Sequence, residues 1–363
     1  MHTEYPMSSL QPSSLPRFTL FNEDCLETAK RLPNTSIDLI YADPPFFTGR
    51  LHSMNGCSFD DIWTNPEEYI EWVKPRLKEF QRILEPTGSI YIHCDWHISH
   101  YLKVLADTIF GRNNFLNEII WKRQSSHNDS KQGSKHFGRI HDSILVYAGS
   151  QEYVWNQQYM PYDKVYIERT YKYAESTTER RYALGDLTGP GGASKGNPLY
   201  EFLGVRRYWR FSKIKMVELL SSGKIAHKKG KVPLLKRYLD EMRGKPVQDI
   251  WTDISLNCKK RQRFPTQKPE ALLERIIKSS SNPEQIIYEP FSGSATSAAV
   301  CHKLSRRWIG SETSENTCAF ALNRLNEIGC DAKLFTKDEI IPKTGSKKEE
   351  GKPHIVLGNS QCL

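Results

Sequence analysis

The chain has 363 residues, of which 38% are hydrophobic and 11% aromatic, and its formal net charge is +9. This composition supports one large α/β domain with a sizeable insertion, or two smaller domains, and argues against global disorder. No run approaches the ~20 apolar residues of a membrane span, the polar N-terminus lacks a secretory signal pattern, and eight cysteines without a C-x-x-C pair argue against disulfides or a zinc site. We expect a cytoplasmic protein without a bound metal.

The first 150 residues alternate between strand and helix patterns. A long helix is predicted to begin at Pro66 after an Asn65 cap, to kink at Pro75 and to end at Gly88. The stretch from Gly49 to Ser58 is rich in Gly, Ser and Asn and is expected to be flexible. The other expected strands are 18–21, 36–42, 89–93, 118–121 and 144–147, and the other expected helices are 26–32 and 97–110.

The pattern degrades from about 151 to 263 and then becomes regular again. Strands are predicted at 285–288 and 308–311, between helices at 269–280, 297–304 and 315–328. The chain therefore divides into a flexible N-terminus (1–17), a first half-domain (18–150), an irregular insertion (151–263), a second half-domain (264–330) and a partly mobile C-terminal extension (331–363).

The basic charge is concentrated in one segment. Residues 191–265 contain 18 Lys and Arg against 6 Asp and Glu, a net charge of +12 that exceeds the value for the whole chain. A basic segment on a slightly acidic body is typical of proteins that bind a polyanion such as nucleic acid. A solvated basic surface without a partner is the alternative.

The first motif with chemical meaning is Asp43-Pro44-Pro45-Phe46, which directly follows an apolar strand. The two prolines hold the chain extended and lack N–H groups, so the Pro44 carbonyl can point outward beside the Asp43 carboxylate. These two oxygens can accept both hydrogens of an amino group and leave its lone pair ready to attack a sulfonium methyl. Phe46 offers a flat face on which a base can stack. An ordinary Asp-Pro-Pro turn is the alternative.

The second motif spans residues 288–296, between a predicted strand and a predicted helix. Its small residues let a ligand approach the backbone, and N–H groups at a helix start favour an anion, here the methionine carboxylate of a cofactor. Glu312 follows at the end of the next strand, 19 residues after Gly293, which is the spacing of a ribose-binding acid. A loop that only packs the helix on the strand is the alternative.

In this order the two motifs resemble those of the β-group amino-methyltransferases of DNA, which modify adenine N6 or cytosine N4. Further matches span roughly residues 18–330. Three departures are Glu289 for Asp, Ser292 for Cys or Ala, and Ala295 for Gly, the last being costly if its φ is positive. The additional matching segments are Asp24-Cys25-Leu26, 141–147, 204–210, 249–253, 264–269 and 308–312.

The resemblance implies a Rossmann-like, S-adenosylmethionine-dependent α/β fold with an inserted target-recognition region at 151–263. It predicts a mostly parallel seven-stranded sheet with one antiparallel strand and helices on both faces. Residues 18–150 form its catalytic half and 264–330 its cofactor-binding half. The implied catalytic residues are Asp43, Pro44, Pro45 and Phe46. The implied cofactor-binding residues are Asp24, Cys25, Asp43, Thr266, Lys268, Glu289, Pro290, Phe291, Ser292, Gly293, Ser294, Thr296 and Glu312.

The implied activity is site-specific methylation of adenine N6 in duplex DNA by base flipping and direct in-line transfer. Cytosine N4, a catalytically weak DNA-binding relative and RNA methylation are the alternatives, whereas cytosine C5 chemistry lacks its Pro-Cys nucleophile. A cognate restriction endonuclease is a possible partner, and the protein is a monomer or a homodimer. The expected DNA contacts are Arg123, His141, Arg206, Arg207, Arg210, Lys228, Lys229, Lys231, Lys259, Lys260, Arg261 and Arg263.

Two smaller groups of residues complete the predictions. His93, His97 and His100 surround Asp95, but their spacing favours ordinary polar surface over a metal site. Lys268 either pairs with an anion or simply begins the following helix.

Overall fold

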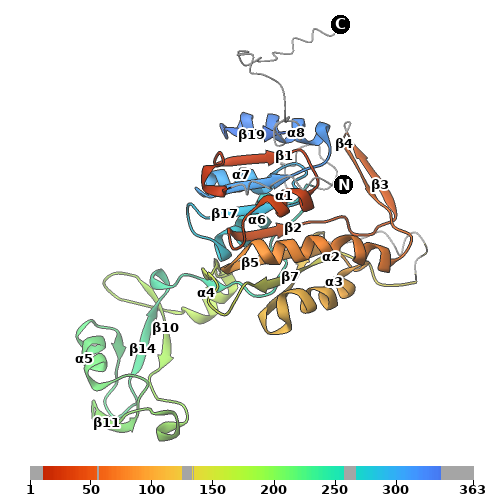
Figure 1. The fold of residues 1–363 in the computed structure, drawn as a ribbon. Helices are drawn as coiled ribbons and strands as arrows, with labels where there is room; N and C mark the ends of the chain where they lie inside the picture. Colours follow the sequence, from red (N-terminus) through yellow and green to blue (C-terminus); the bar gives the residue numbers. More distant parts are fainter. Residues whose placement is uncertain (1–10, 55–56, 125–132, 134, 257–266, 337–363) are drawn as a thin grey trace, which may run out of the picture. The chain divides into compact units, whose positions relative to one another are not determined.

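The computed structural model describes residues 11–336 except 55–56, 125–132, 134 and 257–266. The chain divides into two compact units (Figure 1). Unit 1 contains the chain up to Asn156 and from Asp249 onward, and unit 2 is Gln157–Gln248. Unit 2 thus begins six residues later and ends 15 residues earlier than the predicted irregular insertion at 151–263.

Unit 1 is built on a nine-stranded sheet with the order β16-β6-β7-β5-β2-β17-β18-β1-β19. Strand β7 runs antiparallel to both of its neighbours, and all other neighbouring strands pair in parallel. The strands are β1 (Phe18–Phe21), β2 (Ile37–Ala42), β5 (Leu84–Cys94), β6 (Phe115–Lys122), β7 (His141–Ala148), β16 (Ile250–Trp251), β17 (Ile286–Glu289), β18 (Arg307–Ser311) and β19 (Ala332–Phe335).

The predicted α/β class and its single antiparallel strand are confirmed, but the predicted number of seven strands is wrong. The two additional strands lie at the edges of the sheet. β16 contains only two residues, and β19 lies in the segment expected to be a C-terminal extension. β16 is too short, and β19 too mixed in polarity, for a strand to be predicted from its sequence alone. Each is recognised as a strand by its pairing, β16 with β6 and β19 with β1.

Helices cover both faces of the sheet, as predicted (Figure 1). Helices α1, α2 and α3 pack side by side on one face, and α6 and α7 pack together on the other. None of the described helices is both long enough and apolar enough to cross a bilayer. The helices of unit 1 are α1 (Cys25–Arg31), α2 (Pro66–Ile83), α3 (Ser99–Ala106), α6 (Glu270–Ser280), α7 (Thr296–Lys303) and α8 (Glu315–Glu327).

The stretch expected to be flexible contains two antiparallel strands, β3 (Arg50–Met54) and β4 (Cys57–Asp61), while residues 55–56 between them lie outside the described part of the chain. One local prediction is wrong. Helix α2 ends at Ile83 instead of Gly88, and Gly88 lies inside β5. A Cβ atom at Gly88 would meet the Asp38 carbonyl oxygen at 2.7 Å, so glycine serves close strand packing there and not helix termination.

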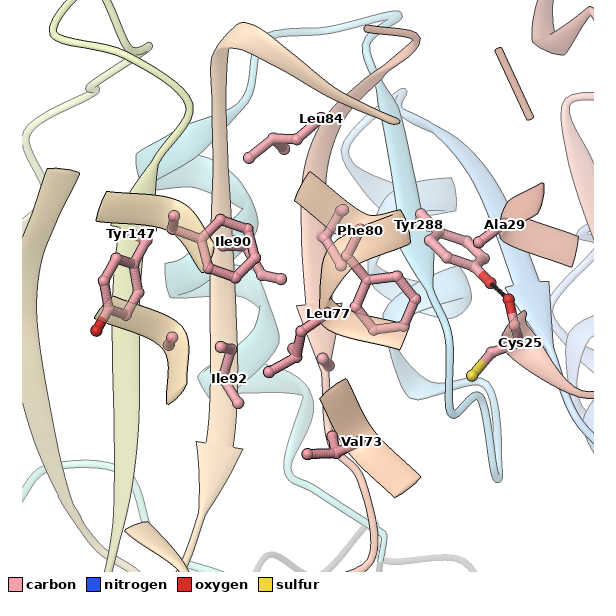
Figure 2. Packing of buried hydrophobic residues seen from close by; sticks show 14 of the residues in the cluster. Cys25, Ala29, Val73, Leu77, Phe80, Leu84, Ile90, Ile92, Tyr147 and Tyr288 are labelled. Carbon is pink, nitrogen blue, oxygen red and sulfur yellow. Dashed lines mark hydrogen bonds between the residues drawn. The ribbon is translucent and has the colours of Figure 1, made fainter. Parts of the chain in front are cut away.

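The core beneath this sheet joins residues from both halves of the chain (Figure 2). Leu77 and Phe80 of α2 are almost fully buried and point toward β5 and β17. The Tyr288 hydroxyl donates a hydrogen bond of 3.0 Å to the Cys25 carbonyl. Truncation of Leu77 to Ala at such a position typically costs about 2–5 kcal/mol. The packing therefore fixes the strand ends that carry the two motifs.

Unit 2 has its own small core, formed by Leu187, Phe202, Trp209, Met216 and Ile225. It contains 19 Lys and Arg against 9 Asp and Glu, whereas the rest of the chain contains 32 Lys and Arg against 33 Asp and Glu. The net positive charge is therefore carried by unit 2. Its elements are a four-stranded sheet of β13 (Ile225–Ala226), β14 (Leu234–Tyr238), β10 (Arg181–Asp186) and β9 (Tyr173–Ala174), the pairs β11 (Leu199–Phe202) with β12 (Val205–Tyr208) and β8 (Tyr159–Met160) with β15 (Lys245–Pro246), and the helices α4 (Lys164–Thr170) and α5 (Lys213–Ser221).

Candidate active site

A pocket of about 630 Å³ lies at the carboxyl ends of the parallel strands of unit 1. Strand β2 leads into Asp43, β17 ends at Glu289, and β18 leads into Glu312. The chain leaves the adjacent strands β2 and β17 in opposite directions along the sheet, toward β5 and β18, and such a switch point is where open α/β sheets bind ligands. The predicted residues that line this one pocket are Asp24, Cys25, Asp43, Pro44, Pro45, Phe46, Arg123, Lys268, Glu289, Pro290, Phe291, Ser292, Gly293, Ser294, Thr296 and Glu312.

The Asp43 carboxylate has one engaged oxygen and one unsatisfied oxygen. Its Oδ2 lies 2.6 Å from the Lys268 Nζ, and the Lys268 ammonium lies 5.1 Å from the centre of the Phe46 ring. Its Oδ1 is buried, has no hydrogen-bond partner among the described residues and lies 4.0 Å from the His93 Nδ1, while Asp43 as a residue lines the pocket. A buried acceptor without a donor is costly, so this oxygen is suited to a donor group of a ligand.

A buried histidine that the sequence analysis assigned to polar surface lies beside Asp43. His93 on β5 is 0% exposed, so that prediction is wrong for this residue. Its Nδ1 is 2.7 Å from the Tyr41 hydroxyl and 4.0 Å from Asp43 Oδ1, and its Nε2 is 3.3 Å from Asp142 Oδ2. The His93 ring also packs 5.6 Å from the Phe46 ring. Successive side chains of a strand point to opposite faces of the sheet, and His93 lies on the face of β5 that is directed toward the site.

Asp142 reaches the pocket because β7 is antiparallel, which places its first residues at the edge where the neighbouring strands end. Burial works against ionisation of Asp142, but the hydrogen bond to His93 and the nearby positive charges outweigh it and lower its pKa. One of these charges is Arg123, whose Nε lies 3.4 Å from Asp142 Oδ1. Arg123, predicted to contact DNA, thus pairs with an acid of the pocket.

The backbone of the second motif is more engaged than predicted. The N–H groups of Ser292, Gly293 and Ala295 donate to the Ser311 carbonyl (3.0 Å), Glu312 Oε2 (3.0 Å) and the Ser292 carbonyl (2.8 Å). In this conformation these three groups are occupied and do not face an anion. Burial raises the pKa of Glu312, which also accepts the Ser314 N–H.

The departure at Ala295 has a structural cost. Its φ is 52°, in the left-handed region, where a side chain other than glycine costs roughly 1–2 kcal/mol. The turn is held from the other side by Arg324 of α8, whose buried guanidinium donates to the Ser294 carbonyl at 2.8 Å and to the Thr296 hydroxyl at 3.0 Å. Arg324 was not predicted as a site residue, because in the sequence it is one of the charged residues of a helix and nothing there indicates its contact with the turn.

Glu289 is buried on the same side of the pocket. The Ser297 hydroxyl donates to its carboxyl group, and the Trp308 indole N–H donates to Ser297 at 2.7 Å. Burial, together with the charge of Asp43, raises the pKa of Glu289 to about 8. Burial thus favours the protonated form of the Glu289 carboxyl.

An aromatic wall closes another side of the pocket. Trp72 packs against Phe291 with ring centres 6.0 Å apart, and the Arg76 guanidinium lies 4.1 Å from the Trp72 ring. Arg76 also binds Asp24 at 2.6 Å. Asp24 caps α1, and burial raises the pKa of the Cys25 thiol, so Cys25 has no reactive thiolate.

The other predicted DNA contacts are distributed differently. His141 is exposed at the start of β7, and unit 2 carries Arg206, Arg207, Arg210, Lys228, Lys229 and Lys231, all exposed. Among the described residues, no cluster of three or more acids, cysteines or histidines is arranged to hold a metal ion. The predicted residues Lys259, Lys260, Arg261, Arg263 and Thr266 lie outside the described part of the chain.

Comparisons with known proteins agree with this arrangement. Type II methyltransferase M.EcaI of Enterobacter cloacae is 31% identical over 284 residues, which cover 76% of this chain and 62% of the relative. The Mod subunit of the type III restriction-modification enzyme StyLTI of Salmonella typhimurium is 26% identical over 344 residues, 80% of this chain and 50% of the relative. DNA adenine methyltransferase YhdJ of Escherichia coli is 26% identical over 309 residues, 85% of this chain and 82% of the relative.

The chain thus spans less than two thirds of the length of the first two relatives. A family model described as DNA methylase matches residues 37–323. The match includes both strand-end motifs, every pocket-lining residue except Glu23, Asp24 and Cys25, and the whole of unit 2. The chain therefore belongs to the N6/N4 family of DNA methylases.

Proposed function

We propose that the chain transfers a methyl group from S-adenosylmethionine to the N6 amino group of adenine in duplex DNA. The observation that carries the proposal is the buried, unpartnered Oδ1 of Asp43 at the pocket. No described residue donates to the Pro44 carbonyl, whereas the Pro45 carbonyl accepts the Tyr69 hydroxyl at 2.9 Å. We assign these two acceptors, one residue apart, to the two hydrogens of an amino group.

The residues around Asp43 fit an aromatic amine. Phe46 offers a ring face that His93 supports from one side, and Lys268 holds the second Asp43 oxygen. With both acceptors engaged by the amine, its lone pair is directed away from them, and catalysis consists of positioning and electrostatics. The ion pair with Lys268 fixes the orientation of the Asp43 carboxylate, whose Oδ1 can accept a hydrogen bond from the amine as its nitrogen becomes positively charged.

The other end of the pocket fits S-adenosylmethionine. Its volume is within the range of small-molecule sites. Glu312 stands at a strand end where an acid can accept ribose hydroxyls, and Trp72 and Phe291 offer faces for an adenine ring. When bound, this cofactor supplies the sulfonium methyl. The residues that would hold it are Asp24, Trp72, Glu289, Phe291, Ser294, Thr296 and Glu312.

Support for adenine comes from Asp at the head of the motif and from the relative named as a DNA adenine methyltransferase. Cytosine N4 is the second candidate, because a carboxylate and a carbonyl can hold either amine. The exposed basic residues of unit 2 suit phosphate contacts with duplex DNA, with the target base flipped out of the stack. One relative is named as the Mod subunit of a type III restriction-modification enzyme, and we extend the proposal to a paired endonuclease of the same site.

The test is transfer of labelled methyl from S-adenosylmethionine to genomic DNA, followed by digestion to nucleosides and mass spectrometry. N6-methyladenine is expected. N4-methylcytosine would assign the second candidate, and the absence of label from DNA together with measurable cofactor binding would assign a non-catalytic relative. Single-stranded DNA and duplex RNA serve as competing substrates in the same assay.

A further inference from the structure

We propose that Asp61 of β4 is a positioning residue that holds the catalytic strand end in its working shape by trapping Phe47 in a strained conformation. This inference rests on the proposed role of Asp43 to Phe46. Phe47 directly follows the motif and has a φ of 62°. Bulky residues rarely occupy this left-handed region, since their Cβ atom crowds the backbone. Strain of this kind persists only where surrounding contacts impose it.

The Asp61 carboxylate supplies these contacts. Its Oδ1 accepts the Phe47 N–H at 2.6 Å, and its Oδ2 accepts the Thr48 N–H at 3.0 Å and the Thr48 hydroxyl. Its backbone carbonyl also accepts the Gly49 N–H at 2.9 Å. Asp61 is 1% exposed, so water does not compete for its oxygens. Hydrogen bonds from N–H groups to an ionised, buried acceptor are the strong ones.

The same turn is anchored on its opposite side. The Tyr69 hydroxyl bonds the Pro45 carbonyl, and the Phe47 ring packs against Trp63 and Tyr69 with ring centres 6.4 and 6.3 Å away. Phe46 lies between these two anchors, and both Asp61 and Phe46 line the pocket. If Phe47 relaxed to an ordinary φ, the direction of the chain at Phe46 would change, and with it the face offered to the base.

Helix and strand patterns could not show this role, because Asp61 lies 14 residues from Phe47 on β4, a strand that was not predicted. Two of the partners of Asp61 are backbone N–H groups, and a sequence does not show which acceptor such a group meets; its side-chain neighbours are the Thr48 hydroxyl and the His52 Nε2, the latter at 3.6 Å. The carboxylate does not touch Asp43, so its effect on methyl transfer is exerted through the backbone of the turn.

The test compares glycine with alanine at position 47. Both remove the ring, but only glycine adopts positive φ without strain. In the Asp61→Ala background, Phe47→Gly should transfer methyl groups about tenfold faster than Phe47→Ala in single turnover, the factor that corresponds to one strained residue. With Asp61 intact the two variants should differ by less than about threefold, because the carboxylate still imposes the conformation. Equal rates for the two Asp61→Ala double variants would overturn the inference.

A second measurement does not depend on turnover. Amide hydrogen exchange at Phe47 and Thr48 should be slow in the native chain and at least about tenfold faster in Asp61→Ala or, if that variant does not fold, in Asp61→Asn. Glu67→Ala removes an exposed acid in the first turn of α2 and should change neither exchange nor methyl transfer. A native chain that methylates no nucleic acid would contradict the proposed function, whereas unchanged exchange at Phe47 and Thr48 would contradict the role of Asp61.

Discussion

The pocket of unit 1 and the surface of unit 2 place their functional residues in opposite ways. In the pocket, acids and aromatic rings are buried at the ends of long-range paired strands. In unit 2, arginines and lysines are exposed on short strands and loops. Chemistry at one amine requires fixed atoms in a dry site, whereas contact with phosphates requires charge near a surface. A single substitution in the pocket should therefore nearly abolish methyl transfer, whereas substitutions in unit 2 should lower the affinity for DNA step by step.

The largest effect is expected for Asp43→Ala. Loss of its two oxygens should lower the rate of methyl transfer by about 10²–10³-fold, the scale seen when a preorganised electrostatic contact is removed. The dissociation constant of S-adenosylmethionine should change by less than about threefold. Isothermal titration calorimetry and single-turnover methyl transfer measure the two effects. Asp43→Asn keeps the shape of the side chain, and a rate close to that of the native chain would show that the negative charge is not needed.

A graded effect is expected when Arg206 and Arg207 on β12 are both replaced by Gln. Their exposed guanidinium groups should contribute phosphate contacts, so affinity for duplex DNA should fall roughly tenfold and the salt slope should decrease by about 2. The rate at saturating DNA should remain native. Lys78→Gln, which removes an exposed charge from α2 of unit 1, is the matched control. A loss of affinity with an unchanged salt slope would mean that these residues do not bind phosphate.

The buried acid of the pocket should give a pH dependence that unit 2 lacks. Glu289 ionises at about 8 in the folded chain against 4.5 for an ordinary Glu. Between these values the unfolded chain binds fewer protons than the folded chain, so the free energy of unfolding should fall as pH rises. Glu289→Gln should remove the contribution of this residue to the decrease in unfolding free energy with rising pH. Urea unfolding at intervals across this range measures it, and identical slopes for both proteins would refute the protonated state of Glu289.

The smallest effect is expected for Ala295→Gly. Relief of the left-handed strain gains roughly 1–2 kcal/mol, while the lost burial of one methyl costs about 0.8 kcal/mol and the freer unfolded chain costs about 0.4–1 kcal/mol. The net change in unfolding free energy should stay within about 1 kcal/mol, and cofactor affinity should not decrease. A stabilisation of more than about 2 kcal/mol in urea unfolding would show that the left-handed conformation at Ala295 costs more than this balance assumes.

The sequence predicted the site best where a motif of reactive or ligand-binding residues follows a buried strand. The Asp43 and Glu289 motifs follow buried strands, so an apolar run plus a short motif sufficed to predict one common edge, and the pocket confirms their proximity. The roles of His93, Asp61 and Arg324 were not predicted. Their hydrogen-bond partners lie 13 or more residues away in the sequence, and several of these partners are backbone groups. Hydrophobic periodicity says which face a residue takes but not which acceptor it meets.

The pairing of strand β1, which lies between β18 and β19, has a consequence for how the molecule is made. Its two neighbours, Trp308 to Ser311 of β18 and Ala332 to Phe335 of β19, are the last strands of unit 1 in chain order. During synthesis on the ribosome, Phe18 to Phe21 must therefore wait until Trp308 to Ser311 have been made before either side of the β1 backbone is paired. The two motifs meet equally late, since β2 and β17 are paired across almost 250 positions. Completion of the sheet and appearance of the pocket should accordingly be one late event, sensitive to any truncation after α7.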